Sequence, residues 1–223
     1  MQRRLTASVG LLLIVLSAPG AAAAQIPGLP VYGGGFSSGI TFGGTVGFAP
    51  SDSPSGKGVA YAGSATLGVG PVGVTGIVSR FDPSASGREA FTQAGGLLTW
   101  KAFGGPLIPL ALYLQGGFSR REDDSAGPGS PEVTRTSIPV GAGISLVIPS
   151  VIVAIKPWIA PRLQISRTSV SGDAKTDTDF AFSAGVDLTT LSGFGFRAMG
   201  DIINGSDPIV GVGLTWSIRV RGL

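Results

Sequence analysis

The feature that most constrains the fold is a strict alternation of residue types from Ile138 to Ser166. Even-numbered positions from Ile138 to Ile148 are apolar, and odd-numbered positions from Val151 to Ile165 are apolar or proline. The intervening positions carry mainly Gly, Ser, Lys, Arg and Gln, and Pro149-Ser150 separates the two runs. A period of two belongs to β-strands with one apolar face. The stretch therefore predicts two strands joined by a tight turn.

The same alternation recurs along the chain and predicts ten strands. They cover 39–49, 58–68, 72–80, 90–102, 108–119, 138–148, 151–166, 178–189, 194–203 and 208–220. The connections alternate in kind. Those after the even-numbered strands are short and built from Gly, Pro and Ser, whereas those after the odd-numbered strands are polar and mostly longer, such as 120–134 and 167–177. This sorting, with an even strand number, is typical of a membrane-spanning barrel.

The predicted fold class is therefore all-β, an up-and-down antiparallel transmembrane β-barrel of ten strands, with eight as the alternative. Strand 151–166 is the weaker part of this prediction, because Pro157 and Pro161 lie inside it and proline removes a ladder donor. A break or bulge is expected there, and it would also account for Trp158 on the polar face. The composition agrees with a barrel: 37 glycines argue against helices, and 13% charged residues leave little solvated surface for a free globule.

The N-terminus predicts export. Arg3 and Arg4 precede an apolar run, and Ala22-Ala23-Ala24 forms a small-residue cleavage site before Gln25. We predict a signal peptide over 1–24, a periplasmic lead-in over 25–38 and the barrel domain over 39–223. The signal peptide carries two arginines and no acidic residue, so the formal net charge of +3 falls to +1 in the exported chain. A nucleic-acid partner is therefore not indicated.

Aromatic residues fall near the two ends of the apolar strand faces, with aliphatic and small residues between them. Such bands are selected at the two membrane–water interfaces. The predicted outer band comprises Phe48, Phe118, Phe180 and Phe182, and the predicted periplasmic band comprises Phe42, Trp100, Phe194, Phe196 and Trp216.

Charged residues within the strands fall on the opposite, polar face. These lumen-facing candidates are Lys101, Lys156, Arg162, Asp187, Arg197, Asp201 and Arg219. An ion-pair network of Asp187, Arg197 and Asp201 is expected, because strands 178–189 and 194–203 are neighbours. Side chains usually fill small barrels, so a structural filling is favoured over a transport path. If the lumen conducts, the excess of cations predicts a weak preference for anions.

The chain has no His and no Cys, which removes disulfides, thiolate chemistry and much of catalysis. Two acidic groups remain as carboxylate-only candidates, Asp173, Asp177 and Asp179 in one loop and Glu122, Asp123 and Asp124 in another. Neither has the spacing of an EF-hand loop, and charged surface loops are usually just solvated. No cofactor, metal or catalytic residue is predicted.

Over Gly39 to Val220 the pattern resembles the small outer-membrane β-barrel proteins of diderm bacteria, the OmpA/OmpX-like group. Members often end in an aromatic residue that the barrel assembly machinery reads, whereas this chain ends in Leu223. The resemblance implies outer-membrane lipid and that machinery as partners, and a monomer. The membrane enzymes of similar outline, the omptins, the phospholipase and the palmitoyltransferase, use a catalytic His that this chain lacks.

Two functions follow as expectations. The first is an integral outer-membrane barrel with a structural, surface-interaction or narrow-pore role and no catalysis. The second is a secreted or periplasmic soluble β-barrel or sandwich whose apolar face forms a core that binds a small apolar ligand.

Overall fold

The structure is a computed structural model, and it describes residues 33–53, 56–85, 89–105, 108–123, 133–170 and 173–218. The predicted signal peptide, the lead-in up to residue 32 and the lumen candidate Arg219 lie outside these ranges. Within them, no helix is long and apolar enough to cross a membrane.

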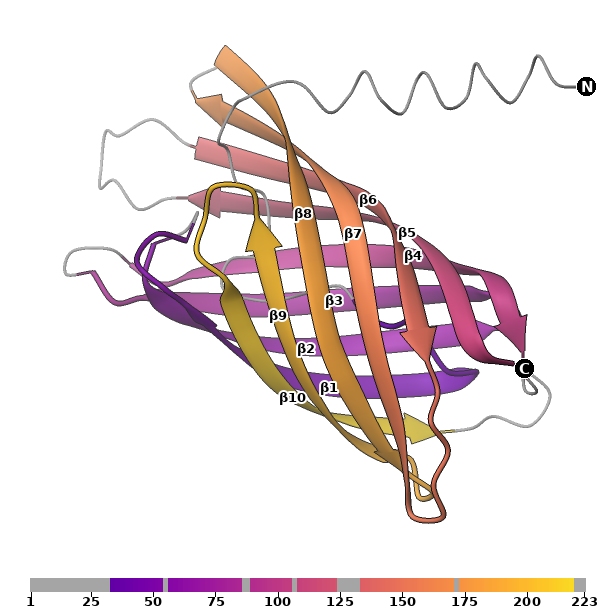
Figure 1. Cartoon of the computed structure of the whole chain (residues 1–223). Coiled ribbons are helices and arrows are strands. Elements are labelled where there is room, and N and C mark those ends of the chain that lie inside the picture. Colours follow the sequence, from indigo (N-terminus) through magenta and orange to yellow (C-terminus); the bar gives the residue numbers. More distant parts are fainter. Residues whose placement is uncertain are drawn as a thin grey trace, which may run out of the picture.

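Ten antiparallel strands form the described part of the chain, and they close into one up-and-down barrel (Figure 1). Closure comes from β1, which pairs with β2 on one side and with β10 on the other. The strands are β1 Gly39–Ala49, β2 Gly58–Val69, β3 Val72–Pro83, β4 Phe91–Gly105, β5 Ile108–Asp123, β6 Val133–Leu146, β7 Val153–Val170, β8 Asp173–Thr190, β9 Phe194–Ile203 and β10 Ile209–Ile218. The predicted fold class and the ten-strand count are confirmed, and the eight-strand alternative is wrong.

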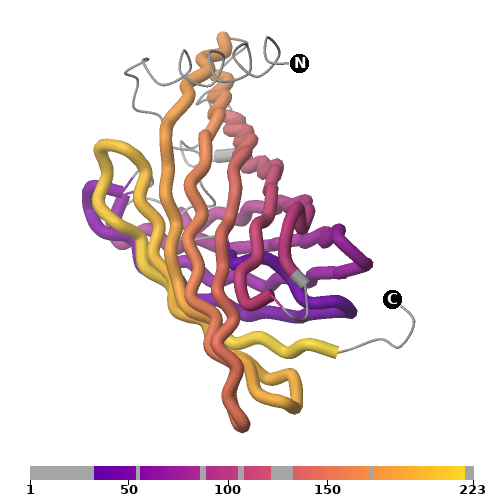
Figure 2. The backbone as a smooth tube through the Cα atoms, turned by 45° about the vertical axis from the view of Figure 1, so that its right-hand side comes forward, coloured from indigo at the N-terminus to yellow at the C-terminus, as the bar shows by residue number. Residues whose placement is uncertain are grey.

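The barrel has two unlike ends. At the turn end, short connections join β2 to β3, β4 to β5, β6 to β7 and β8 to β9; at the loop end lie the remaining connections. β7 and β8 are the longest strands, at 18 residues each, and they run past their neighbours as a projecting hairpin (Figures 1 and 2).

Two segments that were predicted as loops are largely strand in the structure. The segment 167–177 was expected to be a polar loop, but β7 continues to Val170, β8 begins at Asp173, and Arg167 pairs in register with Thr176. Likewise β5 reaches Asp123 and β6 begins at Val133, inside the predicted loop 120–134. These segments lack the alternation of large apolar residues that predicts a strand. Their Thr and Ser side chains nevertheless suit a pleated ladder in which neither face is apolar.

The expected break in β7 is absent. Its ladder with β8 is continuous from Val153 to Val170 in one register. The irregularity falls on the β6 side, where pairing stops at Gly141–Arg162 and resumes in the same register at Ile144–Ile159, opposite Pro161. The missing proline donor therefore interrupts one ladder locally without shifting it, and Trp158 lies inside the barrel with no change of face.

A bulge occurs in β4 instead. The pairing with β5 shifts register between Lys101 and Phe103 and again between Phe103 and Gly105. An extra residue in one strand changes which face the next side chain occupies. Phe103, predicted to lie in a turn, is thereby in a strand and exposed on the outside.

The wall is inverted relative to a water-soluble barrel. Outward positions carry large apolar side chains, such as Val78 at 58% exposure and Leu98 at 56%, while polar residues such as Gln164, Ser183 and Asp201 are buried at 1% or less. Because alternate residues of a strand point to opposite faces, the sequence alternation places the polar set inside on every strand.

Candidate functional site

The barrel interior is the candidate site, because it holds six of the seven predicted lumen-facing charged residues. Arg162, Asp187 and Asp201 are buried, and Lys101, Lys156 and Arg197 are half-buried. All but Lys101 form two separate clusters rather than the one network expected, because Asp201 pairs with Arg162 on β7 and not with Arg197 on β9.

The first group, the Arg162 cluster, comprises Arg162, Gln164, Ser137, Ser183 and Asp201. Arg162 reaches across β8 to Asp201 on β9, with Nη1–Oδ1 at 2.6 Å and Nη2–Oδ2 at 2.9 Å. Nη1 also donates to the Ser183 hydroxyl at 2.6 Å, and Nε donates to Oε1 of the Gln164 side-chain amide at 3.1 Å. Gln164 in turn donates to Ser137, and Ser183 to Asp201.

The side chains of this central pair are 1% and 0% exposed. A bidentate, hydrogen-bonded geometry is what a buried ion pair needs to offset desolvation. The Arg162 cluster therefore ties β6, β7, β8 and β9 together as a polar core.

The second group, the Asp187 cluster, lies nearer the turn end and comprises Lys156, Trp158, Asp187 and Arg197. Arg197 Nε and Nη2 donate to the two Asp187 oxygens at 2.6 and 3.0 Å. The Lys156 ammonium lies 3.4 Å from Asp187, and Trp158 Nε1 donates to the same carboxylate at 3.2 Å. The Lys156 and Arg197 side chains keep 20% and 25% exposure, so this cluster borders open space.

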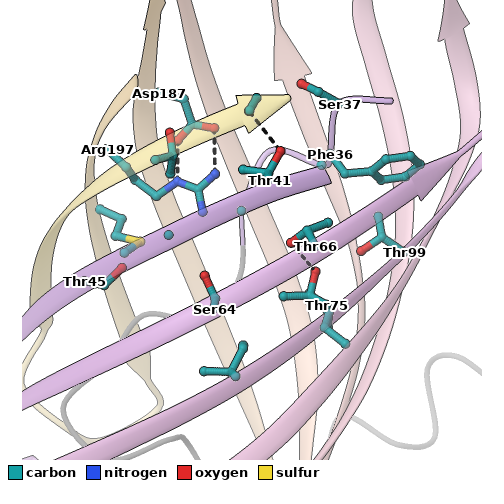
Figure 3. Close-up of a pocket in the computed structure, with 18 of the residues that line it drawn as sticks. Phe36, Ser37, Thr41, Thr45, Ser64, Thr66, Thr75, Thr99, Asp187 and Arg197 are labelled. Carbon is teal, nitrogen blue, oxygen red and sulfur yellow. Dashed lines mark hydrogen bonds and ion pairs between the residues drawn. The ribbon is translucent and has the colours of Figure 1, made fainter. Parts of the chain in front are cut away.

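That space is a cavity of about 120 Å³ (Figure 3). One wall carries Lys156, Asp187 and Arg197 of the Asp187 cluster, and the facing wall is a strip of hydroxyls on β1 to β4 and β10. Within that strip the hydroxyl groups of Thr41 and Ser217 form a hydrogen bond of 2.9 Å, and those of Thr66 and Thr75 form one of 2.8 Å. The lining hydroxyl residues include Thr41, Thr45, Ser64, Thr66, Thr75, Thr99, Thr215 and Ser217. Such a lining suits water and small hydrophilic solutes.

At the loop end an apolar group fills the interior beside β1, β2, β3 and β10. Phe81 is 2% exposed and packs with Ala49, Ala60, Ile77 and Ile209. Its ring lies 5.4 Å from that of Phe91, and the Arg121 guanidinium lies 4.7 Å above the Phe91 ring. This inward-facing group was not predicted. The signal for Phe81 was that it lies on the same alternate positions of β3 as the polar residues.

At the turn end the chain itself enters the barrel. Gly33, Gly34 and Phe36, in the predicted lead-in, are buried among the strands. Phe36 packs edge-to-face on Tyr113 at 6.2 Å, and Lys101 Nζ lies 5.7 Å from the Phe36 ring centre. The sequence signal was the run Gly33-Gly34-Gly35, since glycine permits close approach of backbone to a wall.

The predicted aromatic positions all lie on the outer surface. The nine side chains range from 36% exposure at Phe182 to 60% at Phe194. Phe42 pairs with Trp216, which pairs with Phe194, and the Trp216 and Phe194 rings stack at 6.0 Å. Tyr61 and Phe103 are equally exposed and were missed.

The acidic candidates do not converge. Asp173, Asp177 and Asp179 lie on β8 rather than in a loop; Asp179 is buried inside, and Asp177 pairs with Lys175 at 3.1 Å. Glu122 and Asp123 belong to the end of β5, while Asp124 lies outside the described residues. Among the described residues no three His, Cys, Asp or Glu side chains gather as metal ligands would.

Comparisons with known proteins give a general resemblance. No protein-family model matches the chain, and no curated protein matches it. Among solved structures, the N-terminal β-barrel domain of Pseudomonas aeruginosa OprF matches at 12% identity and a TM-score of 0.39, over 80% of this chain and 96% of that one.

Two further barrels match in the same way. Neisserial surface protein A matches at 14% identity and a TM-score of 0.36, and Ail of Yersinia pestis at 12% and 0.35; each match covers 81% of this chain and 98% of the other. At these TM-scores the assignment of the fold stands on the hydrogen-bonded ladders of this chain.

Proposed function

We propose that this protein is an integral outer-membrane β-barrel whose closed interior makes it an anchor rather than an open pore. The observation that carries the proposal is the inverted wall, with apolar residues outside and charged residues inside. A surface of large exposed Val, Leu, Ile and Phe side chains is far more than a soluble monomer tolerates. Lipid is the solvent that such an exterior suits.

A second observation supports the proposal, namely a sharp upper edge of the apolar exterior. On adjacent strands the last outward apolar residues fall at similar levels: Ile138 pairs with Ile165, and Leu163 pairs with Phe180. Beyond this level the outward residues are polar apart from Ala174. They include Arg120, Thr134, Thr136, Arg167, Ser169 and Thr176. A change from apolar to polar at one height is expected where strands leave a bilayer.

The strand lengths agree with this edge. About 9–11 tilted residues span a bilayer, whereas β7 and β8 have 18 each. The excess forms the projecting hairpin at the loop end. We propose that this polar extension, with the ends of β5 and β6, is the surface through which the protein meets partners outside the cell.

The exposed aromatics support a barrel that spans the membrane, because they lie toward both of its ends. Phe42, Phe194 and Trp216 form a row near the turn end, while Phe48, Phe118 and Phe180 lie toward the loop end. We propose that these are the two interfacial bands, with the turn end in the periplasm. Export through the predicted signal peptide, insertion by the barrel assembly machinery and a monomeric state complete the proposal.

The soluble alternative requires an apolar interior for an apolar ligand. The described interior is instead lined largely by ion pairs and hydroxyls, and its buried apolar residues form three small clusters packed against the walls. No observation favours this alternative.

The experiment is a matched pair of arginine substitutions on the outer face. Leu98→Arg places a charge within the apolar band, and Ser169→Arg places one above its edge, opposite the uncharged Thr134 and Ala174. In lipid vesicles we expect Leu98→Arg to lower the free energy of unfolding by about 2–4 kcal/mol and Ser169→Arg by about 1 kcal/mol or less. Urea titration of tryptophan fluorescence measures both.

If Leu98→Arg is as harmless as Ser169→Arg, the exterior does not face lipid. An increase in aqueous solubility without loss of stability at Leu98→Arg would favour the soluble alternative.

A further inference from the structure

The segment Gly33–Phe36 crosses the turn end of the barrel from one wall to the other. Gly33 lies against Arg197 on β9, where an added Cβ would be 3.3 Å from the guanidinium, and its carbonyl accepts a 2.9 Å hydrogen bond from Gln115 on β5. Gly34 follows against Trp158 on β7, and Phe36 ends beside β2 and β3. The segment therefore contacts strands on both sides of the lumen.

The segment and the wall fit each other through glycines on both sides. A Cβ on Gly34 would be 2.6 Å from Trp158, and one on Gly35 would overlap the Tyr113 ring; Gly35 also has φ +92°, which side chains disfavour. On the wall, a Cβ on Gly68 or Gly73 would lie about 2.5–2.6 Å from the Phe36 ring. Any side chain at these four positions would collide with its partner.

The segment also covers the polar cavity, because Gly33, Gly35, Phe36 and Ser37 form part of its lining (Figure 3). Gln115 contributes an unusual group to this lining: its Oε1 is buried and has no hydrogen-bond partner among the described residues. A buried acceptor left unpaired is costly, and a water molecule in the cavity would satisfy it, since an anion without a proton has no donor to offer.

The charges around the cavity are unbalanced. Lys156 and Arg197 line it and Lys101 lies over Phe36, whereas Asp187 is the carboxylate in its lining. A site with more cations than carboxylates attracts anions.

From these observations we infer that residues Gly33–Ser37 form a plug that closes the turn end of the barrel, and that the cavity beneath it is a site for small hydrophilic anions. The Arg162 cluster and the Phe81 group still fill the interior beyond the cavity, so the site is a vestibule rather than a continuous pore. This inference concerns the interior and does not rest on the proposed membrane role.

The chain has no cysteine, so a single thiol can report access to the cavity. Ser64→Cys places one in the hydroxyl wall, and Ser84→Cys places one on the exposed loop end as a control. The probes are an anionic and a cationic methanethiosulfonate of similar size, applied to the folded full-length protein in detergent. Each thiolate displaces methanesulfinate and forms a mixed disulfide, so the modification rate measures entry.

The plug is displaced by Gly34→Val, which adds bulk against Trp158, with Ser38→Val as a matched change at an exposed position. We expect Gly34→Val to raise the rate at Ser64→Cys roughly tenfold, as overpacking at a close contact would, and to leave the rate at Ser84→Cys unchanged. Ser38→Val should change neither. The ratio of anionic to cationic rates should be higher at Ser64→Cys than at Ser84→Cys.

A rate at Ser64→Cys that is equally fast with and without Gly34→Val would show that the segment covers nothing. A slow rate in every variant would show that the cavity admits no solute. A preference for the cationic probe would overturn the anion assignment.

Phe36→Ala is the second variant, because it shortens the plug without forcing a clash. If both variants lose the folded form, judged by gel mobility before heating, the segment is part of the core and is not a plug. The membrane role can fail independently, through the Leu98→Arg comparison.

Discussion

Each of the two interior clusters is centred on an ion pair between an arginine and an aspartate, but one pair is enclosed and the other borders the cavity. In the Arg162 cluster an arginine and an aspartate are fully enclosed, and hydroxyl and amide groups take up further hydrogen-bonding positions. In the Asp187 cluster one aspartate pairs with an arginine and a lysine and accepts a hydrogen bond from an indole. The two cationic side chains keep a fifth to a quarter of their surface exposed.

The difference indicates which cluster maintains the fold and which is available for function. A charge that is enclosed cannot be hydrated when its counter-ion is removed. A charge beside a polar cavity can be hydrated instead. The Arg162 cluster should therefore be essential for stability, and the Asp187 cluster should tolerate change while setting the properties of the vestibule.

The largest effect is expected from Asp201→Ala. It leaves the Arg162 guanidinium enclosed without its carboxylate, and we expect a loss of about 3–5 kcal/mol in the free energy of unfolding. Urea titration of the protein folded in lipid vesicles measures this.

The control for Asp201→Ala is the double substitution Arg162→Met with Asp201→Leu, which removes both charges. It should recover most of the lost stability, since apolar replacements of a buried pair are often neutral. A single and a double variant of equal stability would contradict the account of this cluster.

A smaller effect is expected from Asp187→Asn. It keeps the shape but leaves Lys156 and Arg197 without a counter-charge, and water in the cavity can hydrate both. We expect a loss of about 1–2 kcal/mol, together with a stronger preference for the anionic probe at Ser64→Cys.

High salt should affect the two clusters differently, because partly exposed charges are screened more than enclosed ones. Added salt should reduce the cost of Asp187→Asn and leave that of Asp201→Ala unchanged. If Asp187→Asn costs as much as Asp201→Ala, the two clusters do not differ in the way proposed.

The smallest effect is expected from Trp158→Phe. The ring still fills the space against Gly34, and only the hydrogen bond from Nε1 to Asp187 is lost. A single such bond contributes about 0.5–1.5 kcal/mol, which the same urea titration resolves. A loss comparable to that of Asp201→Ala would mean that Trp158 packing, rather than its hydrogen bond, supports the turn end.

The wall of the barrel could be predicted from sequence because its signal is local. Alternation alone assigned Arg162 and Asp201 to the inside and Phe48 and Trp100 to the outside. The partners of the charges could not be predicted in the same way. Arg162 reaches past β8 to Asp201, and that contact depends on the stagger of the strands, which no spacing within one strand encodes.

Two further features escaped prediction for different physical reasons. The extension of β7 and β8 to Val170 and Asp173 has no apolar alternation, because neither face needs to be buried outside the band. The plug was expected to be an unpatterned lead-in, since a run such as Gly33-Gly34-Gly35 is typical of flexible chain. The close contacts of Gly34 with Trp158 and of Gly35 with Tyr113 arise only in the folded barrel, so the sequence alone does not show them.

The central claim, that this is a closed barrel held in the outer membrane, is tested most directly by gel mobility of protein extracted from outer-membrane fractions, with and without boiling in SDS. The account predicts that unboiled protein runs at a different position from the boiled chain and is absent from the soluble periplasm. Identical mobility before and after boiling, with the protein recovered in the aqueous fraction, would contradict it.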